Sequence, residues 1–279
     1  MSSPTRPTGV ARAGGEVDDV LMSVLSQRSA RVDIVRSAVV AVLAIVQILV
    51  AVMVGGSVGV VADMLRTPLL AANWAFAIWA PIYIGYLAYA GYQLLPAQRS
   101  REVHRRTGWW MAASGVLNPA WILAFSGRVI LLAQLFLIVL LVVLAVVFGR
   151  LSRESAADRV ERAAFRGPVA LYAGWVSMAT VLGTAATGVW AGLPGANALA
   201  AIAAVVVLLA VAGIVSWVVL SGTAVVPYAA AVVWALVGIA LNGPPAAVVI
   251  TGAVVIVIVL AATVRRVTTA GSRVRAAWG

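Results

Sequence analysis

The sequence contains no cysteine, no lysine and a single histidine, and only 10% of its 279 residues are charged. Without cysteine there is no disulfide, iron–sulfur cluster or thiolate metal site, and His104 alone cannot form a histidine-rich metal site. Hydrophobic residues instead make up 63% of the chain and occur in long uninterrupted runs. This composition is typical of a polytopic membrane protein and excludes an ordinary soluble domain.

Eight apolar runs are long enough to cross a bilayer as helices, since about 20 residues span its hydrocarbon core. They lie at 38–62, 71–95, 108–127, 129–149, 168–190, 197–219, 225–241 and 246–264. Short turns after the third and seventh runs predict two tight antiparallel hairpins. The sequence therefore predicts an all-α fold, a polytopic transmembrane helix bundle of about eight spans. Run 225–241 is the shortest, and if it does not cross, the C-terminus changes sides.

The ends of the chain are polar. We expect residues 1–36 to form a cytoplasmic tail that is disordered over 1–17. Residues 20–35 either have no regular structure or form a short interfacial helix that is capped by Asp18 or Asp19. The first apolar run is too long and too far from the start for a signal peptide, so we expect it to be retained. A basic cytoplasmic tail, 265–279, follows the last run.

Arginine placement tests this topology independently. If the N-terminus is cytoplasmic, only Arg66 and Arg128 of the 20 arginines fall on the outer side. Such asymmetry predicts cytoplasmic termini, a plasma or inner membrane location and anionic lipid headgroups as partners of the arginines. Because the basic residues lie between spans, the net charge of +11 does not indicate nucleic-acid binding. The loops 96–107 and 150–167 are interpreted as topology determinants with no further role.

Charged side chains are absent from the interior of every predicted span. The sequence therefore offers no intramembrane proton relay or carboxylate ion site, which argues against ion-coupled transport. No histidine or carboxylate is placed to activate Ser114, Ser177 or Ser216, so we expect no catalytic site, no metal site and no required cofactor. His104 lies in a charged loop and is interpreted as a solvated residue rather than a haem ligand.

Aromatic side chains are unusually dense in the segment 73–89. On one α-helix, a single face of about 140° would collect most of them, and Trp74 would lie on the other side. The side chains on the shared face are Phe76, Trp79, Tyr83, Tyr86 and Tyr89. An aromatic belt at headgroup level occupies only one or two turns, so this longer stripe predicts one wall of a flat, π-rich ligand pocket.

Three tryptophan motifs follow one another along the chain. Segment 73–89 contains Trp-x-Phe, then Trp79 and, four residues later, Tyr83; 117–125 reads Leu-Asn-Pro-Ala-Trp-Ile-Leu-Ala-Phe, and 172–182 reads Tyr-Ala-Gly-Trp-Val-Ser-Met-Ala-Thr-Val-Leu. They resemble the motifs on the second, third and fifth helices of the TspO/MBR family, the tryptophan-rich sensory or translocator proteins. The resemblance implies a five-helix domain over 37–190, with three additional helices over 191–264.

Several positions depart from the family pattern. Trp74 and Trp79 are one residue closer than in the family, and the proline between Phe76 and the second tryptophan is missing. Ser126 replaces a phenylalanine, Gly183 an asparagine and Leu171 a proline. The chain therefore resembles a divergent, extended member of the family.

The resemblance implies a ligand pocket between the second, third and fifth spans. Its predicted ligand-binding residues are Trp74, Phe76, Trp79, Tyr83, Asn118, Trp121, Trp175, Ala179 and Thr180. A buried Asn118 needs a partner, either another helix or the ligand. Trp121 and Trp175 either pack in the core or offer an indole face and N–H to a ligand. Ala179, Gly183 and Thr187 place a small residue at every fourth position, which favours close helix packing within the chain or across a homodimer.

Three functional hypotheses follow. The first is an integral membrane receptor or carrier for a flat hydrophobic ligand, for which the resemblance implies porphyrin or haem, in a sensory or transport role. The second is a small-molecule permease that uses all eight helices, and the third is a ligand-free structural membrane partner. Transport that survives loss of Trp79 would favour the permease, whereas saturable quenching of tryptophan fluorescence by protoporphyrin would contradict the structural role.

Overall fold

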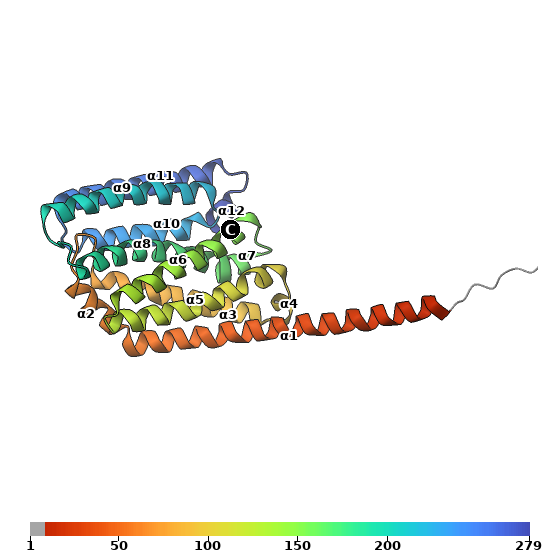
Figure 1. Ribbon diagram of the computed structural model, residues 1–279. Coiled ribbons are helices and arrows are strands. Elements are labelled where there is room, and N and C mark those ends of the chain that lie inside the picture. Colours follow the sequence, from red (N-terminus) through yellow and green to blue (C-terminus); the bar gives the residue numbers. More distant parts are fainter. Residues whose placement is uncertain (1–8) are drawn as a thin grey trace, which may run out of the picture.

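The computed structural model describes the backbone of residues 9–279 and the side chains from Ala30 onward, and every regular element in this part of the chain is helical (Figure 1). The elements are α1 (Gly9–Val54), α2 (Gly56–Met64), the 3₁₀ helix η1 (Asn73–Ile78), α3 (Trp79–Leu94), α4 (Pro96–Arg99), α5 (Glu102–Ser126), α6 (Ile130–Arg153), α7 (Arg159–Glu161), the π-helical turn η2 (Arg162–Arg166), α8 (Gly167–Trp190), α9 (Ala198–Ser221), α10 (Val225–Ala240), α11 (Ala246–Thr269) and α12 (Arg273–Trp278).

Each predicted apolar run contains a helix, but not every helix meets the length and composition expected of a membrane span. Five do, namely Ala30–Val54, Ile130–Arg153, Arg159–Trp190, Ala198–Ser221 and Ala246–Thr269. The helix Val225–Ala240 is apolar but shorter, α3 has only 16 residues, and α5 begins with a charged turn. The all-helical fold is therefore confirmed with five candidate spans, and the count of eight remains a prediction.

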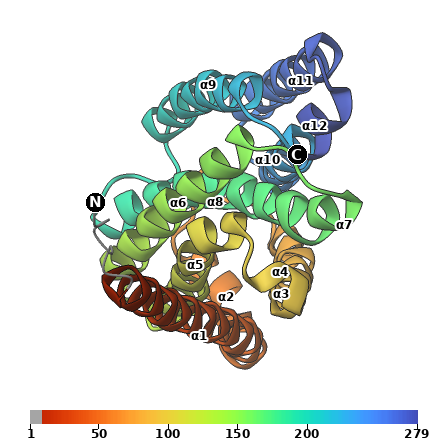
Figure 2. The same ribbon diagram turned by 90° about the vertical axis from the view of Figure 1, so that its right-hand side faces the viewer.

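Some neighbouring helices run antiparallel and others parallel. Gly85 of α3 lies against Pro168 of α8, and Gly115 of α5 lies against Leu43 of α1. The latter contact, together with that of Gly108 against Arg36, shows that α1 and α5 run parallel, with α3 antiparallel to both. Figure 2 shows α9 and α11 side by side in an outer layer, with α10 between them and α8. The last three helices thus join the bundle through α10.

The two predicted hairpins are present. The α5–α6 turn contains Arg128 with a φ of 61°, and the α10–α11 turn contains Gly243 with a φ of 72°. Glycine adopts this left-handed conformation without steric cost. Each pair of helices packs side by side along its length.

The N-terminal region differs from the expectation. Helix α1 is continuous from Gly9 to Val54, so the predicted short interfacial helix is part of a longer one and residues 9–17 are helical. No glycine or proline occurs between Gly15 and Gly55, so nothing in that stretch interrupts helical hydrogen bonding. The rest of the predicted disordered segment lies outside the described residues. The first apolar run is also divided, since α1 ends before the glycine pair at 55–56 and α2 begins there.

The segment 73–89 is not one continuous α-helix. It begins as the 3₁₀ helix η1 and becomes α-helical only at Trp79. Pro81 has no backbone N–H and cannot complete an α-helical hydrogen bond to Ala77, but it is tolerated in the first turn of a helix. A 3₁₀ helix turns by about 120° per residue instead of about 100°, so Phe76 lies one full turn before Trp79 and on the same side, and both line one cavity.

Arginines with described side chains gather at the end of the bundle that carries α4, α7 and α12, except for Arg66 and Arg128. Two carboxylates each bridge two of these arginines. Asp33 pairs with Arg36 at 2.7 Å and with Arg105 at 2.6 Å. Glu161 pairs with Arg101 at 2.7 Å and Arg166 at 2.8 Å. The predicted role of the loops 96–107 and 150–167 as topology determinants alone is therefore wrong, since their charged side chains form ion pairs that join separate elements.

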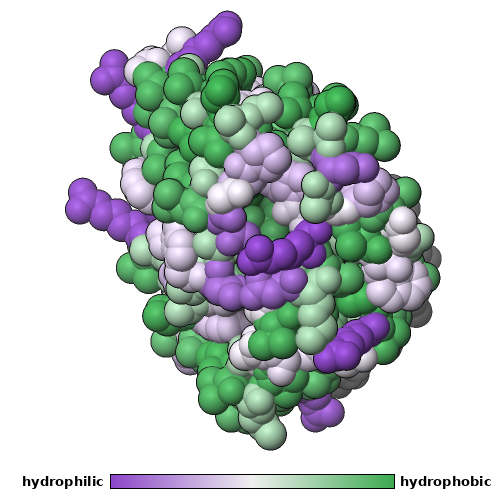
Figure 3. Space-filling view, turned by 90° about the vertical axis from the view of Figure 1, so that its left-hand side faces the viewer, coloured by the Kyte–Doolittle hydropathy of each residue, from purple (hydrophilic) through white to green (hydrophobic). Residues whose placement is uncertain are grey.

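The opposite end of the molecule, near α2, has a different surface. Figure 3 shows that hydrophilic side chains are few on this face and lie among predominantly hydrophobic ones. At this end Arg66 forms an ion pair with Asp63, and the charged atoms of the two side chains lie 3.8 Å apart. The bundle is therefore strongly polarised along its axis, with most of its described cations at one end.

Candidate ligand-binding site

Trp79 lies at the centre of a group of aromatic rings contributed by η1, α3, α5 and α8. We call this group the aromatic cluster; its members are Phe76, Trp79, Tyr83, Trp121, Tyr172 and Trp175. Trp79 is placed to make these contacts because α3 begins there and faces both α5 and α8.

The ring geometry within the cluster is specific. Trp79 stacks on Tyr83 with a centroid distance of 5.7 Å and an interplanar angle of 19°, and lies 5.5 Å from Trp121. It meets Trp175 edge to face at 6.1 Å and 87°. These separations are those at which aromatic pairs attract beyond simple burial. The cluster is therefore a preorganised set of flat surfaces rather than a loose apolar core.

Several polar atoms of the cluster region are buried without a partner. The Tyr83 hydroxyl donates to Oδ1 of Asn118 at 3.2 Å, but Nδ2 of Asn118 donates to nothing among the described residues. The Tyr172 hydroxyl and the Trp175 indole N–H are likewise buried and unpaired. A buried unsatisfied group costs about 1–3 kcal/mol, so the region around the cluster contains polar groups whose hydrogen bonding the described side chains leave incomplete.

A cavity of about 560 Å³ opens beside the cluster and is called here the α2 cavity. Its walls come from the end of α1, from α2, from η1 and α3, and from α5. The lining residues are Ile48, Ala51, Val52, Gly55, Gly56, Val58, Gly59, Val60, Asp63, Asn73, Phe76, Ala77, Trp79, Ala80, Tyr83, Trp121 and Ile122. Asn73 and Asp63 are its polar members besides Tyr83, and Nδ2 of Asn73 donates to Asp63 at 3.0 Å.

A second, much smaller cavity of about 40 Å³ lies on the other side of Phe76 and Trp121. Trp175 and Ala179 of α8 line it together with residues of α2 and α6. Because Phe76 and Trp121 border both spaces, the aromatic cluster forms a partition between them. The larger space lies between the first, second and third predicted spans, whereas the sequence placed the pocket between the second, third and fifth.

Most of the predicted ligand-binding residues come together. Phe76, Trp79, Tyr83 and Trp121 line the α2 cavity. Asn118 is fully buried behind it through its bond to Tyr83. Trp175 and Ala179 lie on the far side of the partition.

Trp74 does not belong to this group. Its side chain is 42% exposed and packs edge to face on Trp234 of α10 at 5.0 Å, away from the cavity. The Trp234 indole N–H donates to the Ala75 carbonyl at 2.7 Å and holds this arrangement. The prediction that Trp74 converges with the other residues is therefore wrong.

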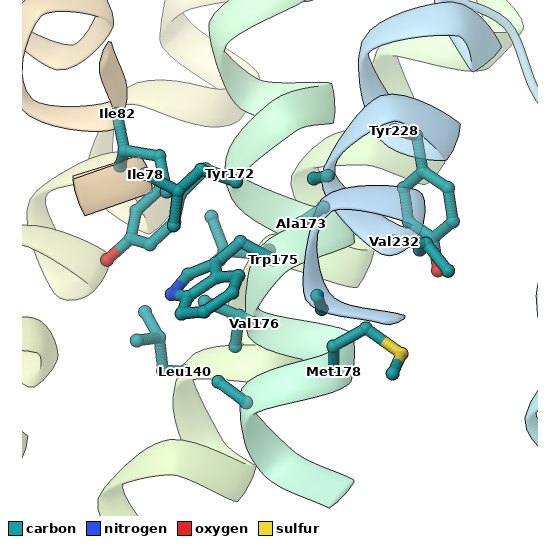
Figure 4. Packing of buried hydrophobic residues seen from close by; sticks show 14 of the residues in the cluster. Ile78, Ile82, Leu140, Tyr172, Ala173, Trp175, Val176, Met178, Tyr228 and Val232 are labelled. Atoms are coloured by element: carbon teal, nitrogen blue, oxygen red, sulfur yellow. The ribbon is translucent and has the colours of Figure 1, made fainter. Parts of the chain in front are cut away.

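Thr180 is the second residue that the structure separates from the site. Figure 4 shows that Tyr172 and Trp175 of α8 lie toward Ile78 and Ile82, whereas Met178 lies toward Val232 of α10. Thr180 lines a third cavity with Met178, and its hydroxyl donates to the Val176 carbonyl. Since 100° per residue separates Thr180 from Ala179 around α8, the two neighbours reach different spaces.

The small residues of α8 have a role within the chain. A Cβ atom at Gly183 would lie 2.4 Å from Oε1 of Gln134, so this glycine leaves room for the Gln134 side chain of α6, which donates to the Thr184 hydroxyl of α8 at 2.8 Å. Gly183 and Thr187 also line the small cavity with Ala179. The face that the sequence assigned either to internal packing or to a homodimer is therefore used internally.

His104 also differs from its prediction. It is fully buried on α5, with both ring nitrogens unpaired, among Tyr89, Tyr92 and Phe165. Helix α5 begins at Glu102, earlier than the predicted span, and its first turn brings the imidazole inward. The interpretation of a solvated histidine is therefore wrong. His104 lines neither the α2 cavity nor the small one.

Sequence reasoning missed several residues of the site. Gly56, Gly59, Asp63 and Asn73 line the α2 cavity, and Tyr172 contributes an unpaired hydroxyl. The glycines between 55 and 59 were the available signal, because three glycines in five residues leave space beside a helix end. Tyr172 stands at the start of the third motif and was visible there.

Comparison with known proteins agrees with this architecture. A family model described as TSPO-like protein matches residues 33–265. The match includes α9, α10 and α11, which the three tryptophan motifs left unmatched. No curated protein and no solved structure matches the chain. The chain therefore belongs to the TSPO-like protein family and is a multi-pass integral membrane protein.

Proposed function

We propose that this protein is a non-enzymatic membrane receptor or carrier that binds a flat, hydrophobic ligand of the tetrapyrrole class, porphyrin or haem, in the α2 cavity. The observation that carries the proposal is the aromatic wall of this cavity, in which Trp79 stacks on Tyr83 beside Trp121. The volume of about 560 Å³ falls within the range of small-molecule sites.

The lining favours recognition by stacking. Apart from Asp63, Asn73 and Tyr83, the side chains that face the cavity are apolar or aromatic. A large π-system gains burial and aromatic contact there, while its polar edge meets Asn73 and Asp63. Arg66 does not line the cavity but lies 3.8 Å from Asp63, which does, so a cation is close to the cavity's polar edge.

Iron ligation is not needed for this mode of binding. The lining contains no histidine or methionine, and Tyr83 and Asp63 are the side chains with an oxygen of the type that can bind iron. We therefore expect metal-free protoporphyrin to bind about as well as haem. This expectation separates stacking from axial coordination, because coordination would favour haem strongly.

The membrane arrangement is part of the same proposal. All eight long helices cross the bilayer of the plasma or inner membrane, with the arginine-rich end and both termini in the cytoplasm. The α2 cavity then lies at the outer end of the bundle. The α2 end carries Arg66 and Arg128, whereas the opposite end carries the arginines that would meet anionic lipid headgroups.

A porphyrin titration of the purified protein, followed by quenching of tryptophan fluorescence, tests the site. Trp79→Leu is expected to raise the Kd about tenfold, since it removes the central stacking surface. Asn118→Leu should weaken binding less, because Asn118 lies behind Tyr83. Equal affinity of the wild type and both variants would contradict the proposal.

Cavity filling supplies a matched pair of variants. Gly56 lines the α2 cavity and Gly91 does not, and a Cβ atom at either position would meet nothing within 4 Å. Gly56→Leu should therefore abolish porphyrin binding, while Gly91→Leu should leave it unchanged. Porphyrin flux in proteoliposomes then distinguishes a carrier from a receptor. A carrier should transport porphyrin and lose this flux in Gly56→Leu, whereas a receptor should bind porphyrin without transporting it. Flux of another small molecule that survives Trp79→Leu would favour the permease.

A further inference from the structure

A third cavity, of about 650 Å³, lies on the side of α8 opposite the aromatic cluster, between α6, α8, α9 and the start of α10. We call it the α9 cavity. Among its lining residues are Leu141 and Phe148 of α6, Val181 of α8, Val215 and Trp217 of α9, and Tyr228 of α10. It shares no lining residue with the α2 cavity, so it is a separate space within the bundle.

The interior of the α9 cavity offers little to a polar ligand. The Ser177 and Tyr228 hydroxyls bond to each other at 3.1 Å, and the Thr180 hydroxyl donates to the Val176 carbonyl at 2.8 Å. The side chains around them are mainly aliphatic or aromatic. Since the hydroxyls inside are already paired, an occupant gains chiefly from apolar burial, as a hydrocarbon chain does.

One side of this cavity is open along the bundle. Helix α9 packs chiefly on α11, and Figure 2 shows α9 set apart from α6. Ile214 and Trp217 line the cavity and are 62% and 70% exposed. In a bilayer this opening faces hydrocarbon, because α6 and α9 are both candidate spans. A lipid acyl chain therefore reaches the space from the side, without crossing water.

The end of the cavity toward the arginine-rich face is cationic. Arg153 and Ser152 line it there. Arg275 donates to the Ser152 carbonyl at 3.3 Å, and Arg266 donates to the Gly222 carbonyl at 3.0 Å. No carboxylate lines the cavity, and none of the three arginines forms an ion pair with a described residue. Three cations without a counter-charge at one end of an apolar space complement an anionic headgroup.

We propose that the α9 cavity binds an anionic phospholipid of the surrounding bilayer, with one acyl chain between α6, α8 and α9 and its phosphate at Arg153, Arg266 and Arg275. This lipid is an individually bound molecule, distinct from the general attraction of the arginine-rich face to headgroups. It fills the space that separates α9 from α6 and so joins the outer layer of helices to the rest of the bundle.

Brominated phosphatidylglycerol tests the acyl-chain part of this proposal, because bromine quenches nearby tryptophan. Trp217 is the one tryptophan that lines the α9 cavity, so subtracting the signal of Trp217→Phe isolates it. Titration of the full-length protein in detergent micelles should give saturable quenching.

A pair of glycine variants provides the control. Gly149 lines the cavity and Gly213 does not, and a Cβ atom at either would meet nothing within 4 Å. Gly149→Phe should abolish the saturable component, while Gly213→Phe should keep it; equal quenching in both overturns the proposal.

The headgroup part has its own test. Arg153→Gln should weaken phosphatidylglycerol binding about fivefold, the contribution of one arginine near an anionic lipid surface. Arg159→Gln is the control, since Arg159 does not line the cavity. Brominated phosphatidylcholine should bind at least fivefold more weakly than phosphatidylglycerol; equal binding overturns the anionic assignment. A brominated fatty acid that binds more tightly than phosphatidylglycerol overturns the phospholipid assignment. The side chains of Arg153 and Arg159 are both exposed. We therefore expect Arg153→Gln and Arg159→Gln to fold even if Gly149→Phe does not.

Discussion

At the scale of single residues, burial changes the chemistry of His104. Removal from water lowers the pKa of its imidazole to about 4, from an ordinary value of 6.5, and nearby Arg101 adds to this effect. Both ring nitrogens are unpaired, so nothing in the described structure compensates a proton there. The folded protein therefore keeps a neutral histidine where the unfolded chain binds a proton.

This difference predicts a loss of stability in acid. Well above pH 6.5 the residue is neutral in both states, and as the pH falls through 6.5 toward 4 the unfolded chain takes up a proton that the folded protein does not. The folded state should thereby lose up to about 3 kcal/mol. Thermal unfolding in detergent at pH 7 and pH 4.5 measures the loss. His104→Leu should show a smaller drop in Tm over this interval, and an identical drop in both proteins would argue against the assignment.

At the scale of elements, single carboxylates tie separate segments together. Glu161, at the end of α7, pairs with Arg101 before α5 and with Arg166 at the end of η2. Arg166 also donates to the carbonyls of Leu151 and Glu154 beyond the membrane-facing part of α6. Both Glu161 and Arg166 are buried, so the loss of one charge leaves the other uncompensated.

Glu161→Gln is therefore expected to destabilise the fold by about 3–5 kcal/mol, the usual cost of breaking a buried pair. Glu154→Gln is the matched control, because the Glu154–Arg106 pair is exposed at both side chains and contributes less than about 1 kcal/mol. Tm values at neutral pH compare the two. Equal shifts in both variants would mean that burial of the Glu161 pair has no energetic weight.

At the scale of the whole molecule, the arginine-rich network and the α2 cavity lie toward opposite ends. The network of Asp33, Glu161 and their arginines closes one end, and the α2 cavity opens near the other. The α9 cavity extends toward the arginine-rich end. This polarity is what a protein with one cytoplasmic and one outer face is expected to show.

Because the chain has no cysteine, single introduced cysteines report its topology directly. Leu193, in the loop between α8 and α9, lies at the α2 end, and Ser272, between α11 and α12, lies at the arginine-rich end. Leu193→Cys should react with a membrane-impermeant maleimide in intact cells, whereas Ser272→Cys should react only after permeabilisation. Labelling of both in intact cells would mean that an even number of spans separates them, which contradicts the three crossings proposed for α9, α10 and α11.

The sequence alone determined the helical class, the positions of the long helices, their hairpins and the family, because long apolar runs, turn residues and ordered tryptophan motifs are local signals. It also identified Phe76, Trp79, Tyr83 and Trp121 as neighbours of one space. Only the tertiary structure decided that Trp74 and Thr180 lie elsewhere, that His104 is buried and that the main cavity borders α2. These outcomes depend on the contact of Trp74 with Trp234 of α10, on the early start of α5 and on the direction in which each face of α8 points. Such features follow from rotation and contact between helices distant in the chain, which hydrophobic pattern and spacing do not encode.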